Sequence, residues 1–160
     1  MQATDSPAHR RARLPVWLAA LGITFAFAFA MPASAAPDSP VGLWKNIDDK
    51  TGEAKALIRI EEVEGVLSGR IESVLTPGRA DATCEQCEGE LKDQPIRGMQ
   101  ILAGLRKVGD WWEGGTILDP NNGKSYKSQL RTIEGGDKLE VRGFIGMPIL
   151  GRTQTWVRQP

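Results

Sequence analysis

Histidine is almost absent from this sequence of 160 residues, which contains only His9. His9 lies in an N-terminal stretch that we expect to be removed, so the remaining chain cannot form a Ser-His-Asp or Cys-His catalytic arrangement. An enzyme would then depend on two carboxylates brought together across neighbouring strands, and the sequence does not identify such a pair. We therefore name no catalytic residue and keep an enzyme as the least favoured functional hypothesis.

An excess of either charge is also lacking, because Lys plus Arg and Asp plus Glu each total 20. Removal of the N-terminal stretch takes away three arginines and leaves a small acidic excess. The sequence shows no basic footprint for a nucleic acid and no polybasic patch for a membrane surface. We expect no nucleic-acid partner and no cofactor.

Long apolar runs are absent except for one near the N-terminus, from Leu14 to Ala30. A basic stretch, 9–13, precedes this run, and Pro32 and the small-x-small sequence Ala33-Ser34-Ala35 follow it. This order is typical of a cleaved signal peptide. We predict a signal peptide over residues 1–35, cleavage after Ala35, a single periplasmic domain over residues 36–160, and no membrane span after cleavage. The alternative is an uncleaved anchor, because about 17 apolar residues are the least that can span a bilayer.

Cysteine is scarce, and the two residues present, Cys84 and Cys87, are only three positions apart. An oxidising compartment favours a local disulfide between them. A structural zinc site would need two more ligands, which carboxylates or a second chain would have to supply. A redox pair would need positive surroundings, whereas Glu85 and Glu88 lie beside these thiols. We favour the disulfide over the other two interpretations and predict no metal site.

No segment after the N-terminal stretch shows a convincing amphipathic helix, and the pattern is that of short strands and tight turns. In residues 54–63, for example, Ala56, Ile58 and Ile60 share one face, which is the period-two alternation of a half-buried strand. Asn122-Gly123 is a strong hairpin signal, and Gly114-Gly115 predicts a bulge or bend. We predict an all-β fold, a small antiparallel up-and-down β-barrel of about eight strands, with a β-sandwich as the alternative. The expected strands are 43–48, 54–63, 66–75, 101–106, 111–119, 124–133, 138–145 and 149–157.

One long polar segment, residues 76–98, interrupts the strand pattern. It contains both cysteines and two prolines, and we expect a long loop with at most a helical turn. Long ordered loops are often functional. The alternative functional hypothesis is therefore a protein-interaction or inhibitor module that acts through this loop on a partner in the cell envelope.

Aromatic residues make up only 6% of the chain, so each one is informative. Trp111 and Trp112 are adjacent and must point to opposite faces of a strand. Packing in the core is the ordinary role of such rings. The alternative is that some of them line a cavity in the barrel. The candidate ligand-binding residues are Trp112, Tyr126, Ser128 and Trp156.

The sequence from Gly42 onward contains a set of distinctive motifs, two of which include Tyr126 and Trp156. The motifs are Gly42-Leu43-Trp44-Lys45, Cys84-x-x-Cys87, Pro95-Ile96-x-Gly98-Met99, Gly114-Gly115-x-Ile117-Leu118-Asp119-Pro120, Gly123-Lys124-x-Tyr126, Val141-Arg142-Gly143 and Gly151-Arg152-Thr153-Gln154-Thr155-Trp156. This set resembles an uncharacterised family of exported bacterial proteins, a domain of unknown function with a lipocalin-like fold. The Gly-x-Trp of the first strand also resembles the broader lipocalin and fatty-acid-binding superfamily. The resemblance implies an antiparallel barrel that captures a small apolar or amphipathic molecule, and it implies no catalytic residue.

The same resemblance implies how the barrel closes. Trp44 should be buried at the closed end, beneath a basic side chain from the last strand. Arg158 and Arg152 are the two candidates, and antiparallel register favours Arg158, because the end of the last strand then lies beside the start of the first. Our leading functional hypothesis is a periplasmic lipocalin-like protein that binds a small apolar or amphipathic ligand.

Overall fold

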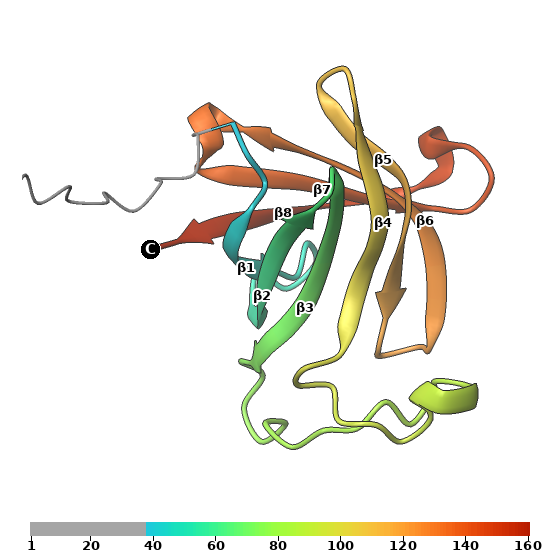
Figure 1. The fold of residues 1–160 in the computed structure, drawn as a ribbon. Coiled ribbons are helices and arrows are strands. Elements are labelled where there is room, and N and C mark those ends of the chain that lie inside the picture. The colour runs from blue at the N-terminus through green and yellow to red at the C-terminus, as the bar shows by residue number, and fades with distance from the viewer. Residues whose placement is uncertain (1–37) are drawn as a thin grey trace, which may run out of the picture. The chain divides into compact units, whose positions relative to one another are not determined.

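The computed structural model describes residues 38–160, which form an antiparallel barrel of eight strands (Figure 1). The predicted all-β, up-and-down barrel is confirmed, and the sandwich alternative is wrong because the sheet is closed. Within the described residues the helical structure is limited to three short 3-10 turns, η1 (Gly89–Leu91), η2 (Glu134–Gly136) and η3 (Pro148–Leu150). The strands are β1 (Gly42–Ile47), β2 (Ala54–Val63), β3 (Val66–Val74), β4 (Gln100–Val108), β5 (Trp111–Asp119), β6 (Lys124–Ile133), β7 (Lys138–Phe144) and β8 (Arg152–Gln159).

Each strand pairs with the next along the chain, and β8 returns to pair with β1. Trp44 lies opposite Arg158 in this last pairing, and Leu43 lies opposite Gln159. The closure matters because an unpaired edge strand exposes backbone donors and acceptors to other chains. The Gly114-Gly115 pair coincides with a register shift between β5 and β6, where we predicted a bend.

Side chains alternate between the inside and the outside of the barrel, as the sequence pattern predicts. On β2, Ala56, Ile58 and Ile60 are buried, whereas the residues between them are more exposed. The inward residues of the other strands complete a single hydrophobic core inside the barrel. Leu67, Leu105, Leu130 and Leu139 are among its fully buried members.

One end of the barrel is closed by Trp44, which is fully buried. Its ring Nε1 donates a hydrogen bond of 2.7 Å to the carbonyl of Pro40, and the guanidinium carbon of Arg158 lies 4.2 Å from the ring centroid. Arg158 crosses over Gly42, where an added Cβ would meet its Nη1 at 3.0 Å, and Gly42 has a φ of +139°. The glycine of Gly-x-Trp therefore provides both the backbone conformation and the room for the arginine.

Residues 76–98 form the expected long loop at the opposite end of the barrel (Figure 1, green to yellow). Cys84 and Cys87 form a disulfide, which confirms the favoured interpretation, and both are buried. A β-bridge between Thr83 and Pro95 joins the two halves of the loop, and the loop makes a close contact with the β5–β6 turn. At Gly123 in that turn, an added Cβ would lie 1.9 Å from the carbonyl oxygen of Gln86.

The strand boundary that the sequence pattern misplaces most is the start of the last strand, whereas the other expected boundaries lie within two residues of the observed ones. We expected the last strand to start at Ile149, whereas β8 starts at Arg152, because Pro148–Leu150 forms the turn η3. The predicted signal peptide and its cleavage after Ala35 lie outside the described residues. Among residues 38–160 there is no helix with both the length and the apolar character that crossing a membrane requires.

Candidate ligand-binding cavity

A cavity of about 920 Å³ occupies the barrel at the end opposite Trp44. It is open to solvent between the β1–β2, β3–β4, β5–β6 and β7–β8 connections. Its deep wall is apolar because the inward positions in this half of the strands carry aliphatic or aromatic side chains. These are Ala56, Ile58, Ile71, Ile101, Ile117, Val141 and Trp156.

A short polar network crosses the cavity wall between the first and the last strand. Asn46 Nδ2 donates to Gln154 Oε1 at 3.0 Å, and the indole Nε1 of Trp156 donates to the same oxygen at 3.3 Å. Gln154 therefore satisfies a buried indole that would otherwise face an apolar cavity. The network gives one side of the cavity hydrogen-bonding groups close to its apolar floor.

A second polar group lies at the β5–β6 turn. Asp119 accepts hydrogen bonds from the backbone and side chain of Asn121, both at 3.0 Å, and from Asn122 at 3.1 Å. Asn122 Nδ2 also lies 3.1 Å from the hydroxyl of Tyr126, which lines the cavity. The Asp119 carboxylate is thus engaged by its own turn, at the place where Asn122-Gly123 predicted a hairpin.

A third polar group, a salt bridge, lies at the mouth of the cavity. The guanidinium of Arg152 contacts both carboxylate oxygens of Asp49, and Asp48 lies 3.7 Å away. The hydrogen bond from Arg152 lowers the pKa of Asp49. Backbone N–H groups of Thr51 and Lys50 lower the pKa of Asp48. A carboxyl held ionised in this way does not suit the role of a general acid, so these groups give the enzyme hypothesis no support.

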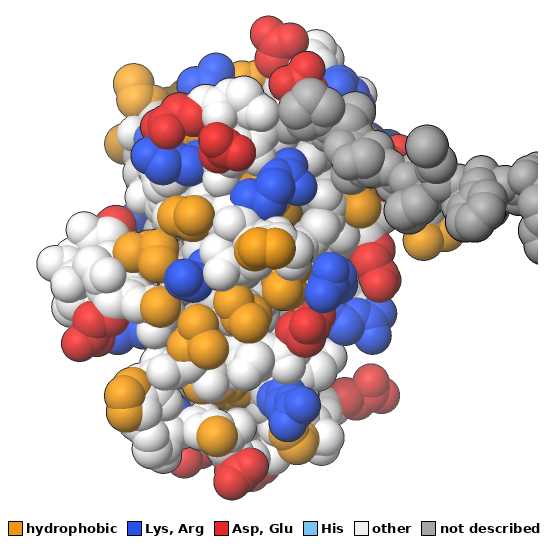
Figure 2. Space-filling view, turned by 90° about the vertical axis from the view of Figure 1, so that its left-hand side faces the viewer, with side chains coloured by type: hydrophobic (Ala, Val, Ile, Leu, Met, Phe, Trp, Pro, Cys, Tyr) orange, Lys and Arg blue, Asp and Glu red, His pale blue; other side chains and the backbone are white. Residues whose placement is uncertain are grey.

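Lys55 and Arg79 add further positive charge to the mouth, and both line the cavity. Lys55 is paired with Glu53 at 2.8 Å, whereas no salt bridge of Arg79 is found within the described residues. On the face shown in Figure 2, acidic and basic side chains are interspersed and hydrophobic side chains gather between them. At the mouth, where Lys55 and Arg152 have carboxylate partners, the charged groups are likewise of both signs.

Two of the four predicted ligand-binding residues, Tyr126 and Trp156, line the cavity. Ser128 is on the same inward face of β6 but lies deeper, where it is buried and does not line the cavity. Its Oγ has no hydrogen-bond partner among the described residues. An unpaired buried hydroxyl normally costs stability.

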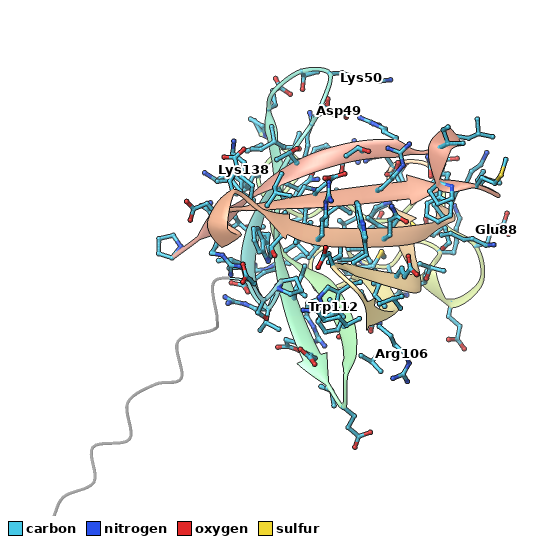
Figure 3. The ribbon with its side chains drawn as sticks, turned by 90° about the horizontal axis from the view of Figure 1, so that it is seen from above. Asp49, Lys50, Glu88, Arg106, Trp112 and Lys138 are labelled. Carbon is cyan, nitrogen blue, oxygen red and sulfur yellow. A yellow bond between two sulfur atoms is a disulfide. The ribbon has the colours of Figure 1, made fainter. Side chains whose placement is uncertain are left out.

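Trp112 is not part of this cavity, so its grouping with Tyr126 and Trp156 is corrected. It is buried near the closed end, where it borders a small depression with Pro40, Arg106 and Lys107. Figure 3 shows Trp112 and Arg106 on the side of the molecule opposite Asp49 and Lys50. The reason is topological, because β5 begins at the same end of the barrel as β1 and Trp112 is its second residue.

Arg152 was one of the two candidates for the side chain over Trp44, and the structure assigns that position to Arg158. Arg152 begins β8 at the mouth, whereas Arg158 ends it at the closed end. The two arginines share a strand and a face but lie at opposite ends of the barrel. Arg152 consequently belongs to the cavity mouth, together with Asp48 and Asp49.

Several cavity residues were not singled out from the sequence, above all Asn46, Gln154 and Ile117. These residues could have been predicted by combining the inward-outward alternation of side chains with the direction of each strand. In an up-and-down barrel, odd-numbered strands end at the mouth and even-numbered strands begin there. The inward residues late in β1 and β5 and early in β8 therefore had to meet at the mouth.

The closed antiparallel barrel with an open apolar cavity defines a protein of the lipocalin-like class. One solved structure of this class, described as "Protein HP1028 from the human pathogen Helicobacter pylori belongs to the lipocalin family", is similar to this chain with a TM-score of 0.67. The two share 20% sequence identity, over 76% of this chain and 84% of that one, so the similarity concerns the fold. No curated protein sequence matches the chain.

The family is established by the sequence itself. Residues 42–158 match the family described as "Uncharacterized protein conserved in bacteria (DUF2147)", and the chain belongs to this family. The match covers every strand of the barrel, from Gly42 in β1 to Arg158 in β8.

Proposed function

We propose that this protein binds a small apolar or amphipathic molecule in the barrel cavity, and that it does so in the periplasm. The observation that carries the proposal is the open cavity of about 920 Å³ with an apolar deep wall. Pockets for small molecules usually enclose roughly 300–1,000 Å³ and combine apolar walls with a few placed polar groups. This cavity has both properties.

The distribution of polar groups favours an amphipathic ligand. An apolar tail fits against Ile58, Ile117 and Trp156, because these side chains line the deep part of the cavity. A polar or anionic head would then lie at the mouth, near Arg79 and Asn122. Because Arg152 and Lys55 already have carboxylate partners, Arg79 is the cation at the mouth best placed to contact an anionic head.

The binding proposal is tested by filling the cavity. Ala56→Phe adds a ring at a buried position that lines it, and binding of an apolar dye, N-phenyl-1-naphthylamine, should weaken by about tenfold or more, equivalent to about 1.4 kcal/mol. The measurement is the fluorescence titration of the dye. Competition with a single-chain fatty acid would show whether amphipathic molecules use the same site.

The matched control is Thr155→Phe, which adds the same ring at an exposed position on the outside of β8. It should leave dye binding unchanged. Equal loss in both variants, or no binding by the unmodified protein, would contradict the proposal.

The periplasmic part of the proposal is supported by the signal-peptide pattern of residues 1–35. The mass of the exported protein should correspond to a chain that begins at Ala36. Recovery of the protein with the Leu14–Ala30 run intact would contradict it.

The alternative function, a protein-interaction or inhibitor module acting through residues 76–98, stays a prediction. Ile96 of this loop is buried against the barrel, as is Met99 just after it, whereas Leu91 is exposed. The arrangement gives the loop a covering role at the cavity and does not favour a partner of the cell envelope.

A further inference from the structure

The connection between β7 and β8 is the most apolar exposed segment among the described residues. Ile145, Met147, Ile149 and Leu150 are exposed to 72%, 63%, 79% and 75% within six residues. The other large exposed hydrophobic side chains in residues 38–160 lie singly on other elements, as Val63, Leu91, Val108 and Val157 do. Single exposed apolar residues are ordinary, but a cluster of this kind marks an interaction site. We call residues 145–150 the apolar loop.

The backbone of the apolar loop is held in place. Arg142, on β7, donates hydrogen bonds to the carbonyls of Pro148 at 2.6 Å and Ile149 at 3.2 Å. At Gly151, an added Cβ would meet the carbonyl oxygen of Gly143 at 2.6 Å, so the loop returns tightly against β7. The apolar side chains are therefore presented outward by a fixed turn.

The loop also borders the ligand cavity. Ile145 and Leu150 line the cavity while remaining largely exposed. Met147 and Ile149 project from the same turn but do not line the cavity. An apolar surface thus continues from the cavity across its rim to the outside of the barrel.

The size of the loop argues against a second protein chain as its partner. A stable protein interface buries about 800 Å² on each partner and uses some 20–30 residues a side. A six-residue loop offers much less, whereas a lipid bilayer accepts a small apolar projection without requiring a complementary surface.

The charges near the loop fit a lipid surface as well. No Asp or Glu occurs between Val141 and the end of the sequence. Arg142 and Arg152 flank the loop, and Arg152 is paired with Asp49. By contrast, the exposed Val63 at the closed end lies in a segment that contains Glu61, Glu62 and Glu64. An anionic bilayer would repel this acidic segment, whereas the apolar loop itself presents no negative charge to the bilayer.

We propose that the apolar loop inserts into the surface of a phospholipid bilayer and places the cavity mouth against it. The ligand then passes between the bilayer and the barrel along the apolar rim formed by Ile145 and Leu150. The docking itself needs only the loop, whereas the passage of a ligand rests on the binding function proposed above.

The test compares two double variants in flotation with vesicles of phosphatidylethanolamine and phosphatidylglycerol. Met147→Asn/Ile149→Asn removes two exposed apolar side chains that do not line the cavity, and it should reduce the vesicle-bound fraction at least several-fold. Val63→Asn/Val108→Asn removes two exposed apolar side chains from the closed end and should bind as the unmodified protein does. Both variants are exported and purified in the same way as the unmodified protein, so any contribution of the N-terminal residues to vesicle binding is equal in all three.

Dye uptake from solution separates this proposal from the binding function. Both double variants should bind N-phenyl-1-naphthylamine normally, and failure of the unmodified protein to bind it would refute the cavity function and leave the docking result standing. Absence of vesicle binding by the unmodified protein, or equal loss in both variants, would overturn the docking proposal. It would also be overturned if light scattering showed a dimer that the loop variant alone converts to a monomer, because the partner would then be a second copy.

Discussion

Replacement of Arg158 by alanine should strongly destabilise the barrel, because this side chain ties together four parts of the closed end. Its guanidinium donates to the carbonyls of Gly136 at 2.6 Å, Val41 at 3.0 Å and Ser39 at 2.7 Å. It also lies over the ring of Trp44 at 4.2 Å. Burial lowers the pKa of Arg158, but a guanidinium stays protonated in proteins, so these bonds persist at all ordinary pH values.

The magnitude follows from these contacts. A hydrogen bond to a charged group contributes roughly 1.5–3 kcal/mol, and a cation over an indole about 0.5–2 kcal/mol. The contacts act as a unit and do not add fully, and Arg158 is only half-buried, so water can reach part of the vacated space. We expect Arg158→Ala to lower the free energy of unfolding by about 3–5 kcal/mol, comparable with the cost of removing the Trp44 ring itself.

The assay is urea denaturation followed by far-UV circular dichroism. With a denaturant dependence near 2 kcal/mol/M, the midpoint should fall by about 2 M. Arg158→Lys keeps the charge but loses the fork of donors, and it should lie between the unmodified protein and the alanine variant.

The matched control is Arg152→Ala, an arginine on the same strand whose exposed salt bridge with Asp49 should contribute no more than about 1 kcal/mol. If the two alanine variants lose the same stability, or if Arg158→Ala costs less than about 1 kcal/mol, the reasoning about the closed end is wrong.

Two further predictions concern the mouth. The Cys84→Ser/Cys87→Ser variant should still fold, because the disulfide closes only a short loop, and its free energy of unfolding should fall by about 2 kcal/mol at most. The change in the urea midpoint measures this loss. A variant that cannot fold would contradict the prediction. The hydrogen bond from Arg152 lowers the pKa of Asp49 in the folded state. The pair therefore stabilises the fold at pH values above the unfolded-state pKa of Asp, which is about 4. This stabilisation is lost as the pH falls through the lower pKa of the folded state. Asp49→Asn should therefore weaken the acid dependence of stability between about pH 5 and 2, and an unchanged dependence would refute the assignment.

Much of the barrel could be predicted because its determinants are local. The alternation of Ala56, Ile58 and Ile60, the Asn122-Gly123 turn and the Gly114-Gly115 bend each specify a strand or its end without knowledge of the rest. The ends of β2, β5 and β6 are those expected. The start of β8 was missed because Ile149 and Leu150 have strand-like side chains, whereas the preceding Pro148 starts a turn.

The site could be predicted only in part, because a cavity depends on where strands lie relative to one another. Alternation showed that Trp111 and Trp112 point to opposite faces, and the structure buries Trp112. The height of Trp112 along the barrel, however, required counting strand directions from β1. The exposure of Ile149 could not be foreseen either, because an apolar side chain beside a predicted strand is normally assigned to the core. The role of Gln154, which accepts from both Asn46 and Trp156, required the register across β1 and β8.

The position of Arg158 has a consequence for how the chain acquires its fold. Arg158 donates a hydrogen bond to Val41, which is 117 positions earlier in the sequence. The contacts that close the barrel therefore join residues from the two ends of the domain. Contacts so distant in sequence make folding slow, and until the final strand arrives β1 and β7 are open edges that other chains can join. Loss of only the last three residues would remove Arg158 and leave the Trp44 ring uncovered. A copy of the chain that lacks Arg158 would therefore stay open to aggregation and proteolysis.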